Sequence, residues 1–184
     1  MRQNLRLLTA LALVIALGAL LTASTGAARS RSATYAVPDS SLVRQIEHYR
    51  HVTWRWQRVM SLPITSGSST YRTDPSLRYR RWVRNLWRTR AARTQRKAHH
   101  PPYLGAWLCI HRYEASWHDG GAPYYGGLQM DVSFQLHYAR RLYRAKGTAD
   151  HWTPLEQIWA AEKARRGGLG FSPWPNTARL CGVL

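Results

Sequence analysis

The chain has 184 residues, enough for one domain of ordinary size with extensions. It carries 27 lysines and arginines against 9 acidic residues, a formal net charge of +18, which implies an anionic partner such as nucleic acid, anionic lipid or an acidic wall polymer. Its two cysteines are too few for the usual structural zinc sites, which use three or four thiolates. The charge lies mainly in the first half: residues 41–100 are net +12 (14 basic, 2 acidic), and residues 101–184 are net +3 (9 basic, 6 acidic).

The first 27 residues predict export. Two arginines precede the apolar run Leu7–Leu21, and Thr25-Gly26-Ala27 fits a small-x-Ala cleavage site. We interpret residues 1–27 as a secretory signal peptide. A retained membrane anchor is the alternative, because the apolar run is close to the lower limit for spanning a bilayer. No cysteine follows the run, which excludes a lipoprotein anchor.

Export determines the expected state of the two cysteines, Cys109 and Cys181. In an oxidising compartment we expect them to form a single disulfide. Cys109-x-His111 reads as one turn of a helix rather than half of a metal site. We therefore predict neither a metal nor a cofactor.

Residues 28–100 are predicted to form a linker and two basic helices. Residues 28–37 are polar, and Asp39 or Ser40 can cap a helix to about Met60. A second helix is expected from Pro75, with Asp74 as its N-cap, to about Lys97. The expected apolar stripes are Leu42, Ile46, Tyr49, Thr53, Trp56 and Met60 on the first helix, and Tyr79, Trp82, Val83, Leu86 and Trp87 on the second. One apolar face on each favours a helical hairpin.

The arginines of this extension allow two interpretations. They are either a solvated face or an electrostatic tether to an anionic wall polymer. Export argues against a nucleic-acid partner. The sequence His99-His100-Pro101-Pro102 marks the domain boundary, because two prolines stop a helix. We interpret the His pair as the close of a basic helix rather than as a metal site.

Residues 101–184 are predicted to be a second, mainly helical domain. We expect a helix from Tyr103 to just beyond Glu114, with Leu104, Trp107, Leu108 and His111 on one side. A tight β-like hairpin over Ala122–Gln129 follows, with further helices expected from Asp131 or Ser133 to Ala145, from Thr153-Pro154 to Gly167, and over Asn176–Cys181. Thr153 and Glu156 have the spacing of a capping box.

Glu114 is the candidate catalytic residue. Cleavage of a glycosidic bond needs a proton donor, which an enzyme obtains by placing a Glu among apolar and aromatic groups. Glu114 has aromatic neighbours whose rings suit the flat faces of sugars: Tyr113, Trp117, Tyr124 and Tyr125. Gly126-Gly127 would let a polymer approach the backbone, and Gln129 could bond sugar hydroxyls or an acetamido group. From the residues alone, however, an isolated Glu at a helix end is more often a surface residue than a catalytic one.

A family resemblance strengthens the catalytic interpretation. Residues 103–184 resemble the resuscitation-promoting-factor-type transglycosylase domain, a small relative of goose-type lysozymes and lytic transglycosylases. The matching residues are Trp107, Cys109, Glu114, Ser116-Trp117, Tyr124-Tyr125-Gly126-Gly127-Leu128-Gln129, Glu156-Gln157-Ile158, Ala161-Glu162, Trp174-Pro175 and Cys181. The first hundred residues lie outside the resemblance.

The resemblance implies a fold, an activity and a disulfide. The implied fold is a mainly α, lysozyme-like α+β domain with a short hairpin beside the cleft. The implied role of Glu114 is general acid at the β-1,4 bond between N-acetylmuramic acid and N-acetylglucosamine, with peptidoglycan as substrate. The family usually has one cysteine directly before its Glu and another two residues after its Trp-Pro. Cys109 and Cys181 are both displaced from these positions by four residues, about one helical turn, which implies that the bridge has moved as a unit.

The second carboxylate used by most glycosidases is not evident. Asp119 and Asp131 are nearby, but they read more simply as a turn residue and a helix cap. A single-acid mechanism, in which the substrate's N-acetyl group or 6-hydroxyl assists, is therefore favoured, and Trp152, Glu156 and Glu162 are interpreted as structural. The leading hypothesis is a secreted, wall-associated peptidoglycan-cleaving enzyme, either a lytic transglycosylase or a muramidase. The alternative is a glycan-binding or signalling module with weak or no cleavage.

Overall fold

The computed structural model describes residues 40–184, and the predicted signal peptide and linker lie outside these residues. Helices dominate this part of the chain, with one two-stranded antiparallel sheet, so the mainly α prediction is confirmed. None of the helices within residues 40–184 is long and apolar enough to cross a membrane. The elements are α1 (Ser40–Val59), η1 (Thr70–Arg72), α2 (Leu77–His99), α3 (Leu104–Glu114), β1 (Tyr124–Tyr125), β2 (Met130–Asp131), α4 (Val132–Lys146), η2 (Ala149–His151), α5 (Pro154–Ala164), η3 (Arg165–Leu169) and α6 (Pro175–Leu180).

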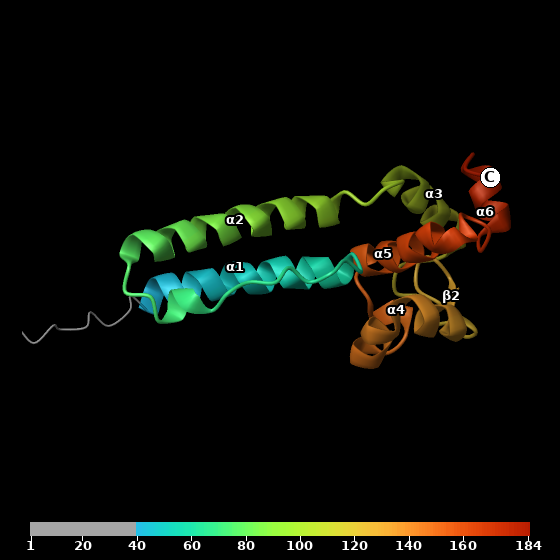
Figure 1. Cartoon of the computed structure of the whole chain (residues 1–184). Helices are drawn as coiled ribbons and strands as arrows, with labels where there is room; N and C mark the ends of the chain where they lie inside the picture. Colours follow the sequence, from blue (N-terminus) through green and yellow to red (C-terminus); the bar gives the residue numbers. More distant parts are fainter. Residues whose placement is uncertain (1–39) are drawn as a thin grey trace, which may run out of the picture. The chain divides into compact units, whose positions relative to one another are not determined.

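The two basic helices form the predicted hairpin, with α1 and α2 antiparallel and side by side (Figure 1). Ile46, Tyr71, Val83 and Trp87 form its buried core. Arg50 is buried beside them: it bonds the Tyr71 hydroxyl, and its guanidinium carbon lies 4.7 Å from the centroid of the Trp54 ring. Packing of one apolar stripe against the other therefore stabilises two helices that are otherwise rich in arginine.

Two details of α2 correct the sequence prediction. Its N-cap is Ser76 rather than Asp74, because the Ser76 side chain accepts from the Tyr79 N–H while Asp74 accepts from Ser76 N. Trp82, predicted in the buried stripe, is 59% exposed. The buried stripe instead includes Arg80, whose Nε donates to the Asp74 carbonyl at 2.8 Å.

A second apolar cluster joins the hairpin to the C-terminal half. Met60, Ala98 and Trp159 are its buried members, drawn from the ends of α1 and α2 and from α5. The Trp159 indole N–H donates to the Ala98 carbonyl at 2.9 Å. α2 ends at His99, two residues beyond the predicted end near Lys97 and directly before His100 and the proline pair.

The C-terminal half packs α3, α5 and α6 around Trp107, Trp152, Ile158 and Trp174, with β2 and α4 alongside (Figure 1). One prediction for α3 is wrong: Leu108 is 46% exposed, and Ile110 is fully buried in its place.

The predicted start signals of the later helices are present. Asp131 caps α4 by accepting from Phe134 N, and Thr153 and Glu156 form the capping box of α5. The regular part of α5 ends at Ala164, earlier than predicted, and continues as the π-helical turn η3.

The β-hairpin lies two residues later in the chain than predicted, over Tyr124–Asp131 instead of Ala122–Gln129. Tyr124 pairs with Asp131 and Tyr125 with Met130, so the second strand begins beyond Gln129. Gly126 has φ of +73° and Gln129 has φ of +46°, which places both in the left-handed region that closes the turn.

The predicted disulfide between Cys109 and Cys181 is confirmed. It links the middle of α3 to the residue that ends α6, closing a sequence separation of 72 residues. The last segment is helical, as the displaced-disulfide argument requires.

Candidate active site

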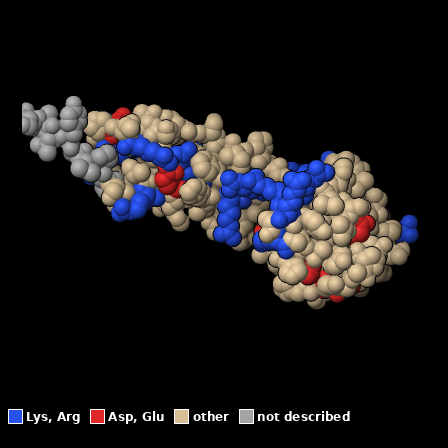
Figure 2. Space-filling model, turned by 90° about the horizontal axis from the view of Figure 1, so that it is seen from below, with Lys and Arg blue, Asp and Glu red and all other residues tan. Residues whose placement is uncertain are grey.

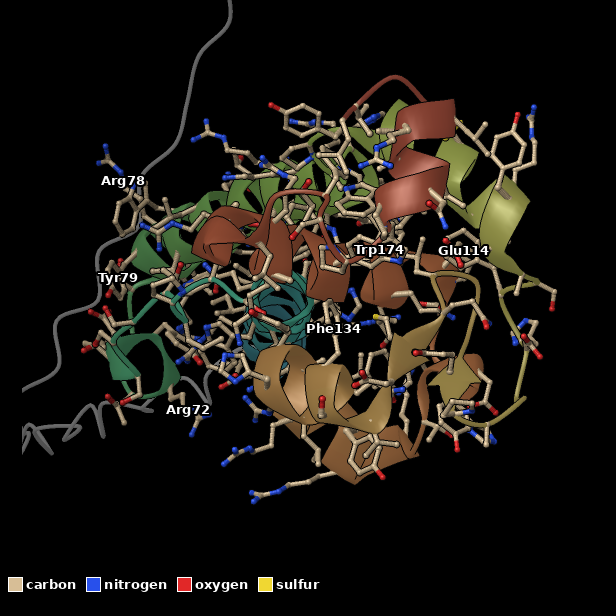
Figure 3. The ribbon with its side chains drawn as sticks, turned by 90° about the vertical axis from the view of Figure 1, so that its right-hand side faces the viewer. Arg72, Arg78, Tyr79, Glu114, Phe134 and Trp174 are labelled. Atoms are coloured by element: carbon tan, nitrogen blue, oxygen red, sulfur yellow. A yellow bond between two sulfur atoms is a disulfide. The ribbon has the colours of Figure 1, made fainter. Side chains whose placement is uncertain are left out.

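Glu114 is the last residue of α3, and the backbone becomes extended at Ala115. Its side chain is half-buried and lies beside α6, as Figure 3 shows. Thr177 of α6 donates its hydroxyl to Glu114 Oε1 at 2.7 Å. A helix end and a neighbouring helix therefore fix this carboxyl group at one oxygen.

The other carboxyl oxygen, Oε2, has no protein partner among residues 40–184. A hydroxyl donor on Oε1 is compatible with a proton on Oε2, because the protonated group keeps Oε1 as an acceptor. The contact with Thr177 orients the group and leaves Oε2 free. This arrangement suits a carboxyl group that delivers a proton to a bound molecule.

Thr177 was not singled out from the sequence. It is buried, and its backbone carbonyl accepts from Cys181 N at 2.9 Å. Cys181 is in turn bonded to Cys109, which lies five residues before Glu114 on α3. The disulfide therefore holds together the two helices that carry Glu114 and Thr177.

His111, three residues before Glu114 on α3, stacks on Trp117 with ring centroids 3.8 Å apart. Its Nδ1 lies 3.3 Å from the Gly127 carbonyl oxygen. A Cβ at Gly127 would come within 2.5 Å of His111 Nδ1 and 2.7 Å of the Trp117 ring, so this stack requires glycine. The close approach to the Gly127 backbone is thus made by the protein's own side chains.

Gln157, on α5, connects several parts of the site and was missed as a functional residue. Its Oε1 accepts from Gly127 N at 2.8 Å, and its Nε2 donates to the carbonyls of Trp117 and Ala149, each at 2.8 Å. The available signal was a polar residue beside Ile158, within an apolar stretch. A fully buried amide needs partners for both ends, and here these partners are the turns around the site.

Both nearby aspartates have structural partners. Asp119 accepts from Gln129 Nε2 at 2.8 Å and from Gly121 N at 3.2 Å. Asp131 accepts from Phe134 N at 2.7 Å, and this backbone hydrogen bond holds the pKa of Asp131 below its usual value. Their predicted roles as turn residue and helix cap are confirmed. The Gln129 amide is engaged by Asp119 and by the Gly126 carbonyl, 3.0 Å away.

The predicted aromatic residues have different exposures. Tyr124 on β1 is 49% exposed, and its neighbour Tyr125 is half-buried against the C-terminal core. Tyr113, next to Glu114, is 54% exposed. Tyr113 and Tyr124 therefore offer accessible ring faces, whereas Trp117 is half-buried and occupied by His111.

The buried acid Glu162, on α5, is bonded to α3 through Trp107. Glu162 is fully buried, and its Oε1 accepts from the Trp107 indole at 2.9 Å and from Arg165 Nε at 2.8 Å. The ion pair keeps the carboxylate from being left unpaired in the core. The structural interpretation of Glu162 is consistent with these contacts.

Residues 40–184 hold no cluster of three or more His, Cys, Asp and Glu side chains suited to a metal ion. Searches of protein-family models, curated proteins and solved structures find no match to this chain.

Proposed function

We propose that this chain is a secreted peptidoglycan-cleaving glycosidase in which Glu114 is the single general acid. The observation that carries the proposal is the Glu114 carboxyl group, held at Oε1 by Thr177 and free at Oε2. Exposed rings of Tyr113 and Tyr124 nearby in the sequence suit the apolar faces of sugars. The resemblance of residues 103–184 to resuscitation-promoting-factor-type transglycosylase domains supports a lysozyme-like domain and this substrate. Export is part of the proposal and rests on residues 1–27.

In the proposed reaction, Glu114 donates the proton on Oε2 to the leaving oxygen of the β-1,4 bond as the C1–O bond breaks. The carboxylate then acts as a base. It takes the proton of the 6-hydroxyl of the same N-acetylmuramic acid residue as that oxygen attacks C1. The product is an anhydro ring, and Glu114 recovers its proton. Thr177 would hold Oε1 in place through both proton transfers.

The contacts of the two aspartates favour this single-acid route over the two-carboxylate route. A carboxylate that acts as nucleophile or base must face the sugar. Asp119 is bonded to Gln129 and Gly121, and Asp131 caps α4. Each carboxylate is therefore bonded to the protein's own groups rather than directed at a substrate.

The test is release of soluble fragments from purified, peptide-bearing peptidoglycan by the wild type and by Glu114→Gln. The amide keeps the shape and can still accept from Thr177, but it cannot donate an acidic proton. The expected loss is at least about a hundredfold, typical of a removed general acid. Asp74→Asn is the matched control, because it also replaces a carboxylate by its amide, but in the loop before α2. This variant should keep full activity. Undiminished release by Glu114→Gln would rule out the acid assignment.

The second candidate is a glycan-binding or signalling module that keeps the site but cleaves poorly. The exposed rings of Tyr113 and Tyr124 favour it, because ring faces bind sugars whether or not a bond is cut. Co-sedimentation with insoluble wall separates the two functions. Binding that is equal in wild type and Glu114→Gln, without release of fragments by either protein, would favour this module.

A further inference from the structure

A groove of about 690 Å³ lies between the end of α1, the following loop, α4 and α5. None of the residues that line it belongs to the candidate active site. Its cationic residues come from both halves of the described chain: Arg55, Arg58, Arg140, Arg141, Arg144 and Lys163. From the sequence we predicted anion binding only for the basic extension, residues 28–100. Four of these six residues lie beyond it, in the C-terminal half.

The charge of the groove is not neutralised from within. Its single acidic residue, Glu156, is bonded to Lys146 at 2.7 Å, and Lys146 does not line the groove. None of the six cations has an ion-pair partner within residues 40–184. The lining therefore carries six positive charges and one negative charge, a net of +5. Figure 2 shows the molecule from below, and in this view lysines and arginines gather in a band near the centre.

The rest of the groove is mostly aliphatic. Val59, Leu62, Ile64 and Leu142 contribute side chains to it, and Ile64 is exposed. This lining follows from the end of α1. Ser61 adopts φ of +52°, and Leu62 N bonds back to the Gln57 carbonyl at 2.8 Å. The left-handed residue reverses the chain and brings Leu62 and Ile64 beside the helices.

The combination of charge and apolar surface discriminates among anionic partners. Sites for single-stranded nucleic acid interleave cations with aromatic platforms for the bases, whereas this groove has Tyr138 and His137 as its only rings. A polyol phosphate would leave the aliphatic surface unused. A flat bilayer surface does not enter a concavity. An amphiphile with an anionic head uses both features, because the head pairs with arginine and the chain covers the aliphatic side chains.

We propose that this groove binds a phosphate-headed lipid as a single molecule, with its head at the arginines of α1 and α4 and its chain along Leu62, Ile64 and Leu142. The proposal is independent of Glu114. It would give the protein a lipid ligand distinct from its glycan substrate. The chemistry of recognition is an anionic head combined with an aliphatic chain, and neither part alone is sufficient.

The experiment is calorimetric titration of the full chain with decyl phosphate below its micellisation concentration. Decyl maltoside supplies the chain without the charge, and glycerol phosphate supplies the charge without the chain. We expect decyl phosphate to bind at least about tenfold more tightly than either. Equal affinity for glycerol phosphate would reduce the groove to a simple anion site, and equal affinity for decyl maltoside would reduce it to an apolar surface. Either result would overturn the proposal.

Two charge reversals of equal size locate the site. Arg141→Glu with Arg144→Glu changes the groove, and Arg88→Glu with Arg93→Glu changes exposed positions of α2 outside it. The groove pair should weaken decyl phosphate binding by about tenfold or more, and the α2 pair by less than about twofold. Equal losses would indicate general surface electrostatics and contradict the proposal.

A third variant and two further ligands complete the test. Ile64→Ser should weaken decyl phosphate binding while leaving the thermal unfolding midpoint nearly unchanged, because Ile64 is exposed. Anionic phospholipid vesicles and a single-stranded oligonucleotide are titrated in parallel. Binding to either one without binding to decyl phosphate would replace the proposed ligand with a membrane surface or a nucleic acid.

Discussion

At the scale of single residues, the hydrogen bond from Thr177 determines which carboxyl oxygen of Glu114 is accessible to a substrate. The hydroxyl occupies one carboxyl oxygen and leaves the other accessible. Without that contact the carboxyl group could rotate and divide its time between orientations. Thr177 is therefore a positioning residue for the proposed reaction.

Thr177→Val keeps the size of the side chain and removes its donor. We expect kcat on peptidoglycan to fall by roughly tenfold, since a lost hydrogen bond of about 1.4 kcal/mol corresponds to that factor. KM should change little, because Thr177 is buried and does not meet the polymer. Thr177→Ser, which restores the hydroxyl, should recover most of kcat. A Val variant with wild-type kcat would show that the hydrogen bond is not used.

At the scale of elements, the capping box of α5 links stability to pH. Burial raises the pKa of Glu156, but hydrogen bonds from Lys146 and Thr153 outweigh burial and hold the pKa below its ordinary value. A lowered folded-state pKa stabilises the fold above the unfolded value. That contribution is lost as the pH falls through the folded value, because the unfolded state then binds more protons.

Glu156→Gln tests this linkage, because Gln can keep the capping geometry but cannot carry the charge. We expect the wild type to have the higher free energy of unfolding at pH 7. The difference should begin to shrink below the ordinary Glu pKa of about 4.3 and disappear in stronger acid. Urea unfolding of both proteins across this range measures it. A difference that stays constant with pH would contradict the assigned shift.

The disulfide has an effect at the same scale. Replacing both Cys109 and Cys181 with Ala removes a bridge that spans 72 residues. We expect a loss of about 2–4 kcal/mol in the free energy of unfolding, measured with urea. Activity should also fall, because α6 would no longer be fixed against α3 at Thr177. A variant that is less stable but equally active would show that the disulfide stabilises the fold but is not needed to position Thr177.

The elements were predicted better than the site. Regular spacing and capping residues marked the helices, and a capping box such as Thr153–Glu156 is a local signal. The wrong or missing predictions concern tertiary contacts. Trp82 faces solvent because the packing of α2 on α1 places Arg80 in its stead. The contacts of Thr177 and Gln157 join segments 63 and 30 residues apart, a separation that no local pattern records.

At the scale of the whole described chain, the hairpin and the C-terminal half share a buried cluster. Trp159 is its largest member, and its indole bonds the last turn of α2. Arg166 adds a hydrogen bond to the Met60 carbonyl at 3.3 Å. These contacts predict that residues 40–184 unfold as one cooperative unit.

Trp159→Ala removes the centre of that cluster. We expect a cost of about 3–5 kcal/mol and a calorimetric trace that separates into two transitions. Trp82→Ala is the matched control. Because Trp82 is exposed, its loss should change stability by less than about 0.5 kcal/mol and leave one transition. A single, unshifted transition in Trp159→Ala would mean that the cluster does not couple the two parts.

Glu114 is proposed to cleave the glycan as the only acid of the site. Mass analysis of fragments released from peptidoglycan by the wild type and by Glu114→Gln tests it most directly. We expect wild-type fragments that end in anhydro-N-acetylmuramic acid, lighter by one water than hydrolysis products, and almost none from the variant. Fragments of the same kind and amount from Glu114→Gln would contradict it.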